Sequence, residues 1–173
     1  MHLITYIGID NGVGTVGLIT NVYTEAGKFI RQEADILPVP IRKELDYTKK
    51  KQMVSRLDIK AMRQLLKGFK PENTFVALER PMVNPGRFKA SAVGLRIYEA
   101  MLIALEDTGH RRLVIDSKAW QKEILPSGIK GSDKLKKASA QIGKQLFPHL
   151  EKKIKRDADG LLIAYWLSNK GEL

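Results

Sequence analysis

The sequence predicts an α/β domain with a mixed sheet flanked by helices, and three observations support this fold class. The first forty residues contain strand-like segments separated by glycine and proline turns. The following residues alternate short apolar runs with longer segments of helical spacing. The 173 residues are the usual length of one domain and can bury a sizeable core, so we expect residues 1–173 to form a single domain.

Three strands are expected at the N-terminal end. Leu3–Asp10 ends in Asp-Asn-Gly and Gly14–Tyr23 follows a glycine-rich turn, so these segments should form a hairpin. Lys28–Val39 is a third strand with alternating apolar residues, and Pro38 and Pro40 end it. Three sequential strands imply an antiparallel meander.

Helices and strands alternate in the rest of the chain. Lys49–Phe69 carries apolar residues at helical spacing, whereas the apolar run Thr74–Glu79 between two prolines indicates a buried strand. Phe88–Glu106 is helical, with apolar positions on more than one face, so we expect it to pack on the sheet and on a second surface. The remaining predicted elements are a strand at Arg112–Ile115 and helices at Ser117–Ile124, Asp133–Leu146 and Asp157–Asn169.

The charge balance indicates a polyanionic partner. Thirty Lys and Arg against nineteen Asp and Glu give a net charge of +11, which favours nucleic acid, although charge alone also fits an unrelated basic protein. The absence of cysteine excludes disulfides, thiolate chemistry and cysteine-ligated zinc. No apolar run is long enough to span a membrane and no secretory signal is recognisable, so we expect a cytoplasmic protein without membrane contact.

Acidic residues stand at the ends of two predicted strands. Asp10 ends the first strand and Glu79 ends the buried strand before Pro81, and α/β sheets place ligands at strand ends. Two neighbouring carboxylates are tolerated if one is protonated or a cation lies between them, and oxygen ligands favour magnesium or manganese. Asp157 and Asp159 add further acids where the last helix begins.

Each of these acids also has a purely structural interpretation. Asp10 could set the turn with the Asn-Gly that follows it, and Glu79 could pair with Arg80. Asp157 could be the N-cap of the last helix. These alternatives are open at the level of the sequence.

Segments spread over nearly the whole chain resemble motifs of one nuclease family. They are Gly8–Gly17, Ala77–Pro81, Asp116–Trp120, Gly131–Ser139 and Asp157–Ala164. In this order they resemble the RuvC branch of the ribonuclease-H-like superfamily, especially the phage-encoded Holliday junction resolvases. The first segment alone is similar to actin-like and sugar-kinase folds, but those need a second phosphate-binding hairpin and a longer chain.

The resemblance implies a fold and a metal site. The fold is a ribonuclease-H-like mixed five-stranded sheet, with its first three strands antiparallel, flanked by α-helices. Asp10, Glu79 and Asp159 match the metal-ligand positions for two Mg²⁺ ions, for which Mn²⁺ would substitute. The family commonly places another Asp or His one helical turn before the last aspartate, but this chain has Arg156 there. Asp157 is therefore the candidate for a fourth catalytic ligand, if it sits at the helix cap.

The same resemblance suggests DNA contacts. Lys118 and Lys134 match basic positions of the family and could hold phosphates, although most surface lysines are only solvated. Met82 stands where the family often carries an apolar wedge, and it could equally be a buried loop anchor. The full set of candidate DNA-binding residues is Lys118, Lys134, Lys137, Arg80, Met82 and Arg156.

The expected function is resolution of four-way (Holliday) junctions by magnesium-dependent hydrolysis, leaving a 5′ phosphate and a 3′ hydroxyl, in a bacterial cell or a phage-infected host. A junction has approximate two-fold symmetry, so we expect a homodimer. Its interface should involve Phe88–Glu106, with Val93, Ile97 and Met101 as contacts. The alternatives are a looser nuclease for branched or flap DNA and a non-catalytic basic nucleic-acid-binding protein.

Overall fold

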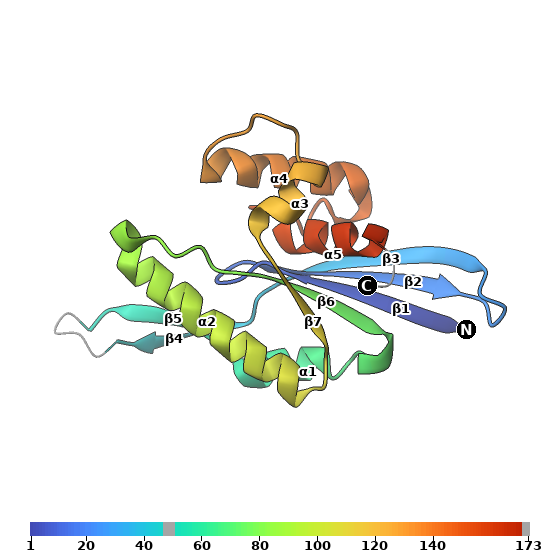
Figure 1. Cartoon of the computed structure of the whole chain (residues 1–173), viewed down its shortest axis with the longest axis horizontal. Helices are drawn as coiled ribbons and strands as arrows, with labels where there is room; N and C mark the ends of the chain where they lie inside the picture. Colours follow the sequence, from blue (N-terminus) through green and yellow to red (C-terminus); the bar gives the residue numbers. More distant parts are fainter. Residues whose placement is uncertain (47–50, 171–173) are drawn as a thin grey trace.

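A five-stranded mixed sheet forms the centre of the computed structural model, which describes residues 1–46 and 51–170 (Figure 1). The strand order is β3-β2-β1-β6-β7. β1, β2 and β3 pair antiparallel, while β6 runs parallel to β1 and β7 parallel to β6. The predicted meander and mixed sheet are confirmed. The strands are β1 (His2–Ile9), β2 (Thr15–Tyr23), β3 (Phe29–Pro38), β6 (Thr74–Glu79) and β7 (Arg112–Ile115).

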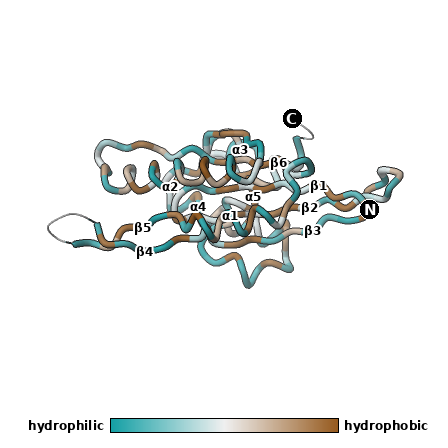
Figure 2. Tube along the Cα trace, turned by 90° about the horizontal axis from the view of Figure 1, so that it is seen from below, coloured by the Kyte–Doolittle hydropathy of each residue, from teal (hydrophilic) through white to brown (hydrophobic). Residues whose placement is uncertain are grey.

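Helices cover both faces of this sheet (Figure 1). One face carries α3 (Ser117–Ile124), α4 (Ser132–Leu146) and α5 (Asp159–Lys170), and the other carries α1 (Ile59–Leu66) and α2 (Phe88–Asp107). Each face has its own apolar core. Figure 2 shows hydrophobic positions along the strands and along α5 in the middle of the molecule. No helix within the described ranges is long and apolar enough to cross a membrane.

Glycines allow α5 to lie directly on the β1–β2 hairpin. Gly8 and Gly17 face each other in the strand register. A Cβ atom on Gly8 would collide with the backbone of Gly160 and Ala164, and one on Gly17 would collide with the backbone of Leu161. Larger residues at these positions would push the helix off the sheet, so the glycines fix where the helix N-terminus lies.

The segment predicted as one helix, Lys49–Phe69, is mostly not helical. Its residues Met53–Leu57 form β5 instead, which pairs with β4 (Ile41–Leu45) in a hairpin separate from the main sheet. Only α1 is helical in the second half of the segment, and residues 47–50 lie outside the described part. The prediction was therefore wrong for the first half.

Two local features explain this error. In β5 the buried residues are Ser55 and Leu57, which alternate with less buried ones as a strand requires. Asp58 then starts α1, because its carboxylate accepts a hydrogen bond from the backbone N–H of Ala61 at 3.0 Å. Apolar residues on a strand and on the following helix happened to share one helical spacing.

The predicted dimer contacts on α2 need correction. The helix forms as expected, but Ile97 and Met101 are fully buried in the core between α2, α1 and the sheet. They cannot contact a second subunit without unfolding that core. Val93 is half-buried against the same core, and the exposed apolar residues of this helix include Leu95 and Ile103.

Candidate metal centre

The central strands carry two acids to the same edge of the sheet. Asp10 directly follows β1, and Glu79 is the last residue of β6. The two strands are parallel neighbours in which Ile9 lies opposite Leu78. The next residue on each strand therefore lies at the same edge, as the sequence predicted.

The turn after Asp10 is held by the backbone. The N–H of Asp10 donates to the carbonyl oxygen of Thr15 at 3.0 Å. A Cβ atom on Gly14 would collide with the Asp10 carboxylate, so glycine at this position leaves room for it. The Asp10 side chain is therefore not needed to close the turn and can face the other acids.

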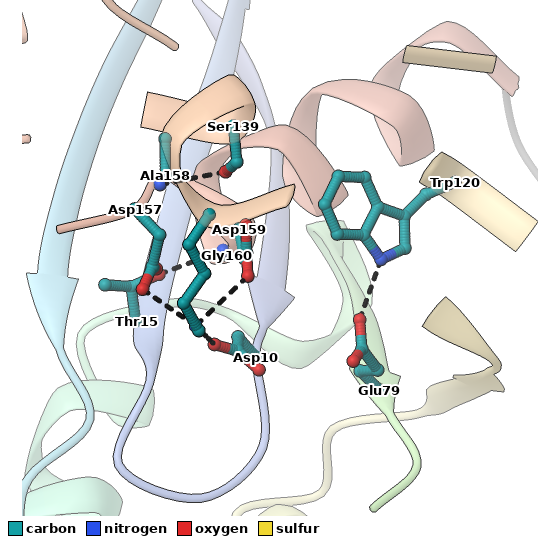
Figure 3. A network of polar contacts seen from close by, with 10 residues as sticks. Asp10, Thr15, Glu79, Trp120, Ser139, Asp157, Ala158, Asp159 and Gly160 are labelled. Carbon is teal, nitrogen blue, oxygen red and sulfur yellow. Dashed lines mark hydrogen bonds and ion pairs between the residues drawn. The ribbon is translucent and has the colours of Figure 1, made fainter. Parts of the chain in front are cut away.

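Two side chains hold the start of α5 beside this turn. The Thr15 hydroxyl accepts a hydrogen bond from the backbone N–H of Gly160 at 2.9 Å. The Ser139 hydroxyl of α4 accepts one from the backbone N–H of Ala158 at 3.0 Å. The aspartates on either side of Ala158 are thereby fixed relative to the β1–β2 turn (Figure 3).

Three aspartates meet at this point. Asp10, Asp157 and Asp159 each offer a carboxylate oxygen, and these oxygens all lie within 4.8 Å of one another. We call these residues the aspartate cluster. Glu79 is at the same edge but turns toward α3, where its Oε2 accepts a hydrogen bond from the indole Nε1 of Trp120 at 2.7 Å (Figure 3).

A lysine occupies the aspartate cluster. The Nζ atom of Lys136, on α4, lies 2.9 Å from Asp157, 3.5 Å from Asp159 and 3.8 Å from Asp10, measured to the Oδ2 atoms. Burial would lower the pKa of Lys136, but its hydrogen bond to Asp157 and the other two carboxylates raise that pKa overall. Lys136 therefore stays positively charged among the three acids.

Even with this lysine, burial and mutual repulsion oppose ionisation of the acids at this centre. Burial, and then repulsion by Asp159 and Glu79, raise the pKa of Asp10 well above its ordinary value. Burial raises the pKa of Glu79 to about 7, although the hydrogen bond from Trp120 acts in the opposite direction. Burial is also the main cause of the raised pKa of Asp159. Such a set of acids favours a bound cation.

The donor set fits a divalent cation. Its ligands are carboxylate oxygens, which magnesium and manganese prefer. The Asp157 carboxylate is 5% exposed, and its Oδ1 is buried without a hydrogen-bond partner. A buried unpaired carboxylate oxygen is costly, and coordination of a cation would satisfy it. Asp10, Asp157 and Asp159 are the residues that could hold a cation between them, with Glu79 beside them.

Asp157 does not cap α5. Its Oδ2 accepts from Lys136 and its Oδ1 has no partner, so neither oxygen binds a backbone N–H of the helix. The residue lies just before the first helical turn, which allows it to face the same point as Asp159. The capping interpretation is therefore wrong, and Asp157 meets Asp159 from a position two residues before the helix, without capping it.

The alternative that Glu79 pairs with Arg80 is also wrong. Arg80 forms a two-pronged ion pair with Asp116, with its Nε and Nη2 atoms 3.1 and 2.7 Å from the carboxylate oxygens. This pair is exposed, with 54% of the Arg80 side chain accessible. Arg80 is therefore paired with Asp116 in the DNA-free protein, through a contact that is exposed and weak.

The other candidate DNA contacts lie on the surface. Lys118, Lys134, Lys137 and Arg156 are all exposed. Lys134 and Lys137 line one shallow depression together with Lys130. Met82 is 79% exposed, so it is not a buried loop anchor.

Sequence reasoning missed Lys136 and Trp120. On α4, Lys136 shares a face with the buried Ser139 and Gly143, three and seven residues later. A lysine on the buried face of a helix could have indicated an acidic partner. Trp120 is the buried residue of α3, but its partner Glu79 is 41 positions away, and no local pattern predicts that contact.

Known proteins resemble this chain in structure but not in sequence. No family model and no curated protein matches the chain by sequence. Among solved structures, Thermus thermophilus RuvC in complex with a Holliday junction substrate is similar, with a TM-score of 0.52 and 17% identity over 98% of this chain and 97% of that chain. Another Thermus thermophilus RuvC structure gives 0.53 and 15% identity over the same shares.

The chain has a RuvC-like fold. The likeness extends over almost the full length of both chains, which confirms the ribonuclease-H-like sheet and helix arrangement expected from the motifs. At this level of identity the comparison concerns the fold, and the chemistry has to be argued from the site.

Proposed function

We propose that the protein is a Holliday junction resolvase of the phage RuvC type, which hydrolyses phosphodiester bonds with the help of Mg²⁺. The observation that carries the proposal is the aspartate cluster beside Glu79, at the carboxyl ends of the central parallel strands. The net charge of +11 supports a polyanionic substrate. The similarity to the solved structure of RuvC in complex with a Holliday junction supports branched DNA as the substrate.

The acids and Lys136 would have different roles in the reaction. Two bound Mg²⁺ ions would supply an activated water and compensate charge on the leaving 3′ oxygen. Asp10, Asp157 and Asp159 would hold and orient them, and Glu79 would complete the ligand set from the α3 side. Lys136, whose side chain is 24% exposed, can release the carboxylates and donate a hydrogen bond to a substrate phosphate. The products would be a 5′ phosphate and a 3′ hydroxyl.

Surface cations would position the DNA. Lys118, Lys134, Lys137 and Arg156 are exposed and can bind phosphates that flank the cleaved bond. Such contacts give affinity and orientation without sequence preference. The exposed Met82, in the loop after Glu79, can contact bases at the branch.

We further propose a homodimer that joins through the exposed face of α2. This face presents Leu95 and Ile103 beside an open groove, which is also lined by Arg96 and Glu99 of α2 and by Glu44 of β4. Apolar residues among charges of both signs suit a self-complementary contact. Leu95→Glu should dissociate the dimer, which can be measured as a mass change by light scattering.

A cleavage assay on defined DNA tests the function. We expect the protein to nick a synthetic four-way junction symmetrically in Mg²⁺ and to leave linear duplex intact. Asp10→Asn should abolish cleavage and retain junction binding, since it removes a ligand but preserves volume and the basic surface. Equal cleavage of flaps would indicate a looser nuclease, and binding without cleavage would indicate a DNA-binding protein.

A further inference from the structure

Glu79 is held by a contact that the aspartate cluster does not share. Its carboxylate accepts a hydrogen bond from the indole N–H of Trp120 at 2.7 Å, on the side away from the cluster (Figure 3). We propose that Trp120 is a positioning residue: its N–H holds the Glu79 carboxylate at a distance from the three aspartates and thereby sets where Glu79 can bind a cation. This inference rests on the proposed metal-dependent function.

Trp120 is suited to this role because the surrounding core packs tightly around its ring. Its side chain is fully buried in the core between α3, α5 and the sheet. The indole N–H is a donor only, and when buried it needs an acceptor. Within the described residues, Trp120 is the side chain that donates a hydrogen bond to Glu79. A rigid donor thus fixes one oxygen of a flexible glutamate and leaves the other oxygen for a cation.

Two contacts fix the distance between the end of β6, which carries Glu79, and the start of α3, which carries Trp120. The N–H of Arg80 donates to the carbonyl oxygen of Ile115 at 2.9 Å, where β6 runs beside β7. The Arg80–Asp116 ion pair adds a second link between the end of β6 and the start of α3. That ion pair is exposed and contributes little energy, whereas the hydrogen bond from Trp120 is partly buried and ends on a carboxylate oxygen of Glu79.

Loss of the indole N–H would free Glu79. Lys136, which lies in the aspartate cluster, attracts the Glu79 carboxylate electrostatically. A Glu79 carboxylate released from α3 would be drawn toward Lys136. All four acids would then surround one cation position, and the second position would lose its ligand. Loss of a group that orients a metal ligand typically costs about 10–100-fold in metal affinity or activity.

An isosteric replacement tests the N–H alone. Trp120 is replaced by β-(3-benzothienyl)alanine, in which sulfur stands in place of the indole N–H, in a Trp166→Phe background. The matched control is the same background with natural Trp120, so both proteins keep the same ring volume in the core. Mn²⁺ binding to the DNA-free protein is measured by electron paramagnetic resonance and calorimetry, and junction cleavage is measured under single-turnover conditions over a range of Mg²⁺.

We expect the replacement to weaken the binding of Mn²⁺ about 10–100-fold at one site and to raise the Mg²⁺ concentration for half-maximal cleavage similarly, without a change in junction affinity. Equal Mn²⁺ binding and equal Mg²⁺ dependence in the two proteins would overturn the inference. Failure of the control to cleave any branched DNA would refute the proposed function instead. In that case the Mn²⁺ measurement still decides whether Trp120 positions Glu79.

Discussion

Removal of the lysine from the aspartate cluster should destabilise the metal-free protein in a manner that depends on pH. Lys136 makes ion pairs with three carboxylates at 2.9 to 3.8 Å, and the nearest, Asp157, is almost fully buried. In Lys136→Met these acids lose their cation. Removing one partner of a buried ion pair costs about 3–5 kcal/mol.

The free energy of unfolding should fall by about 3 kcal/mol at pH 8, the lower end of that range, because Lys136 is partly exposed and the acids can take up protons. For a chain of this size, 1 kcal/mol corresponds to a shift of about 2–4 °C in Tm, so Tm should fall by about 6–12 °C. The loss should shrink as the pH falls, because burial raises the pKa of Asp10 and of Asp159, and their protonated carboxyl groups no longer need the cation. Added Mg²⁺ should also restore much of it, since it replaces the missing charge.

The assay is thermal unfolding in EDTA and in Mg²⁺ at several pH values. The matched control is Lys137→Met, which removes the same charge from the neighbouring position on α4, where the side chain is exposed. The control should change stability by less than about 0.5 kcal/mol. Equal shifts for the two variants, or a Lys136→Met shift that is the same at every pH, would refute the reasoning.

Three further predictions follow from the same site. In EDTA, protonation of Glu79 should stabilise the protein below pH ~4.5, and this stabilisation, at most about 3 kcal/mol, should be lost as the pH rises through the folded pKa of about 7. Denaturant titrations over this pH range should show the loss for the natural protein and not for Glu79→Gln. Asp157→Asn and Asp159→Asn should each reduce single-turnover junction cleavage at least ~100-fold, because both carboxylates lie in the cluster; near-normal cleavage by Asp157→Asn would assign Asp157 a structural role. Gly17→Ala should destabilise the protein by about 1–3 kcal/mol, since the methyl group would collide with α5, and an unchanged Tm would show that α5 can shift without cost.

The sequence by itself determined the elements that have a clear local period. The three N-terminal strands, the buried strand before Pro81 and the helices after it were predicted close to their observed bounds, because alternation and helical spacing are properties of neighbouring residues. The positions of Asp10 and Glu79 at two strand ends followed in the same way. The β4–β5 hairpin was missed, because its apolar residues continue the spacing of α1 by coincidence.

Tertiary structure alone decided how the acids are used. Gly160 and Thr15, which are 145 positions apart, form the hydrogen bond that brings the start of α5 to the β1–β2 turn. That contact places Asp157 in the cluster instead of at a helix cap, and packing of α4 places Lys136 among the acids. Local sequence patterns report the face on which a residue lies, whereas the partner it meets there depends on how distant elements pack against each other.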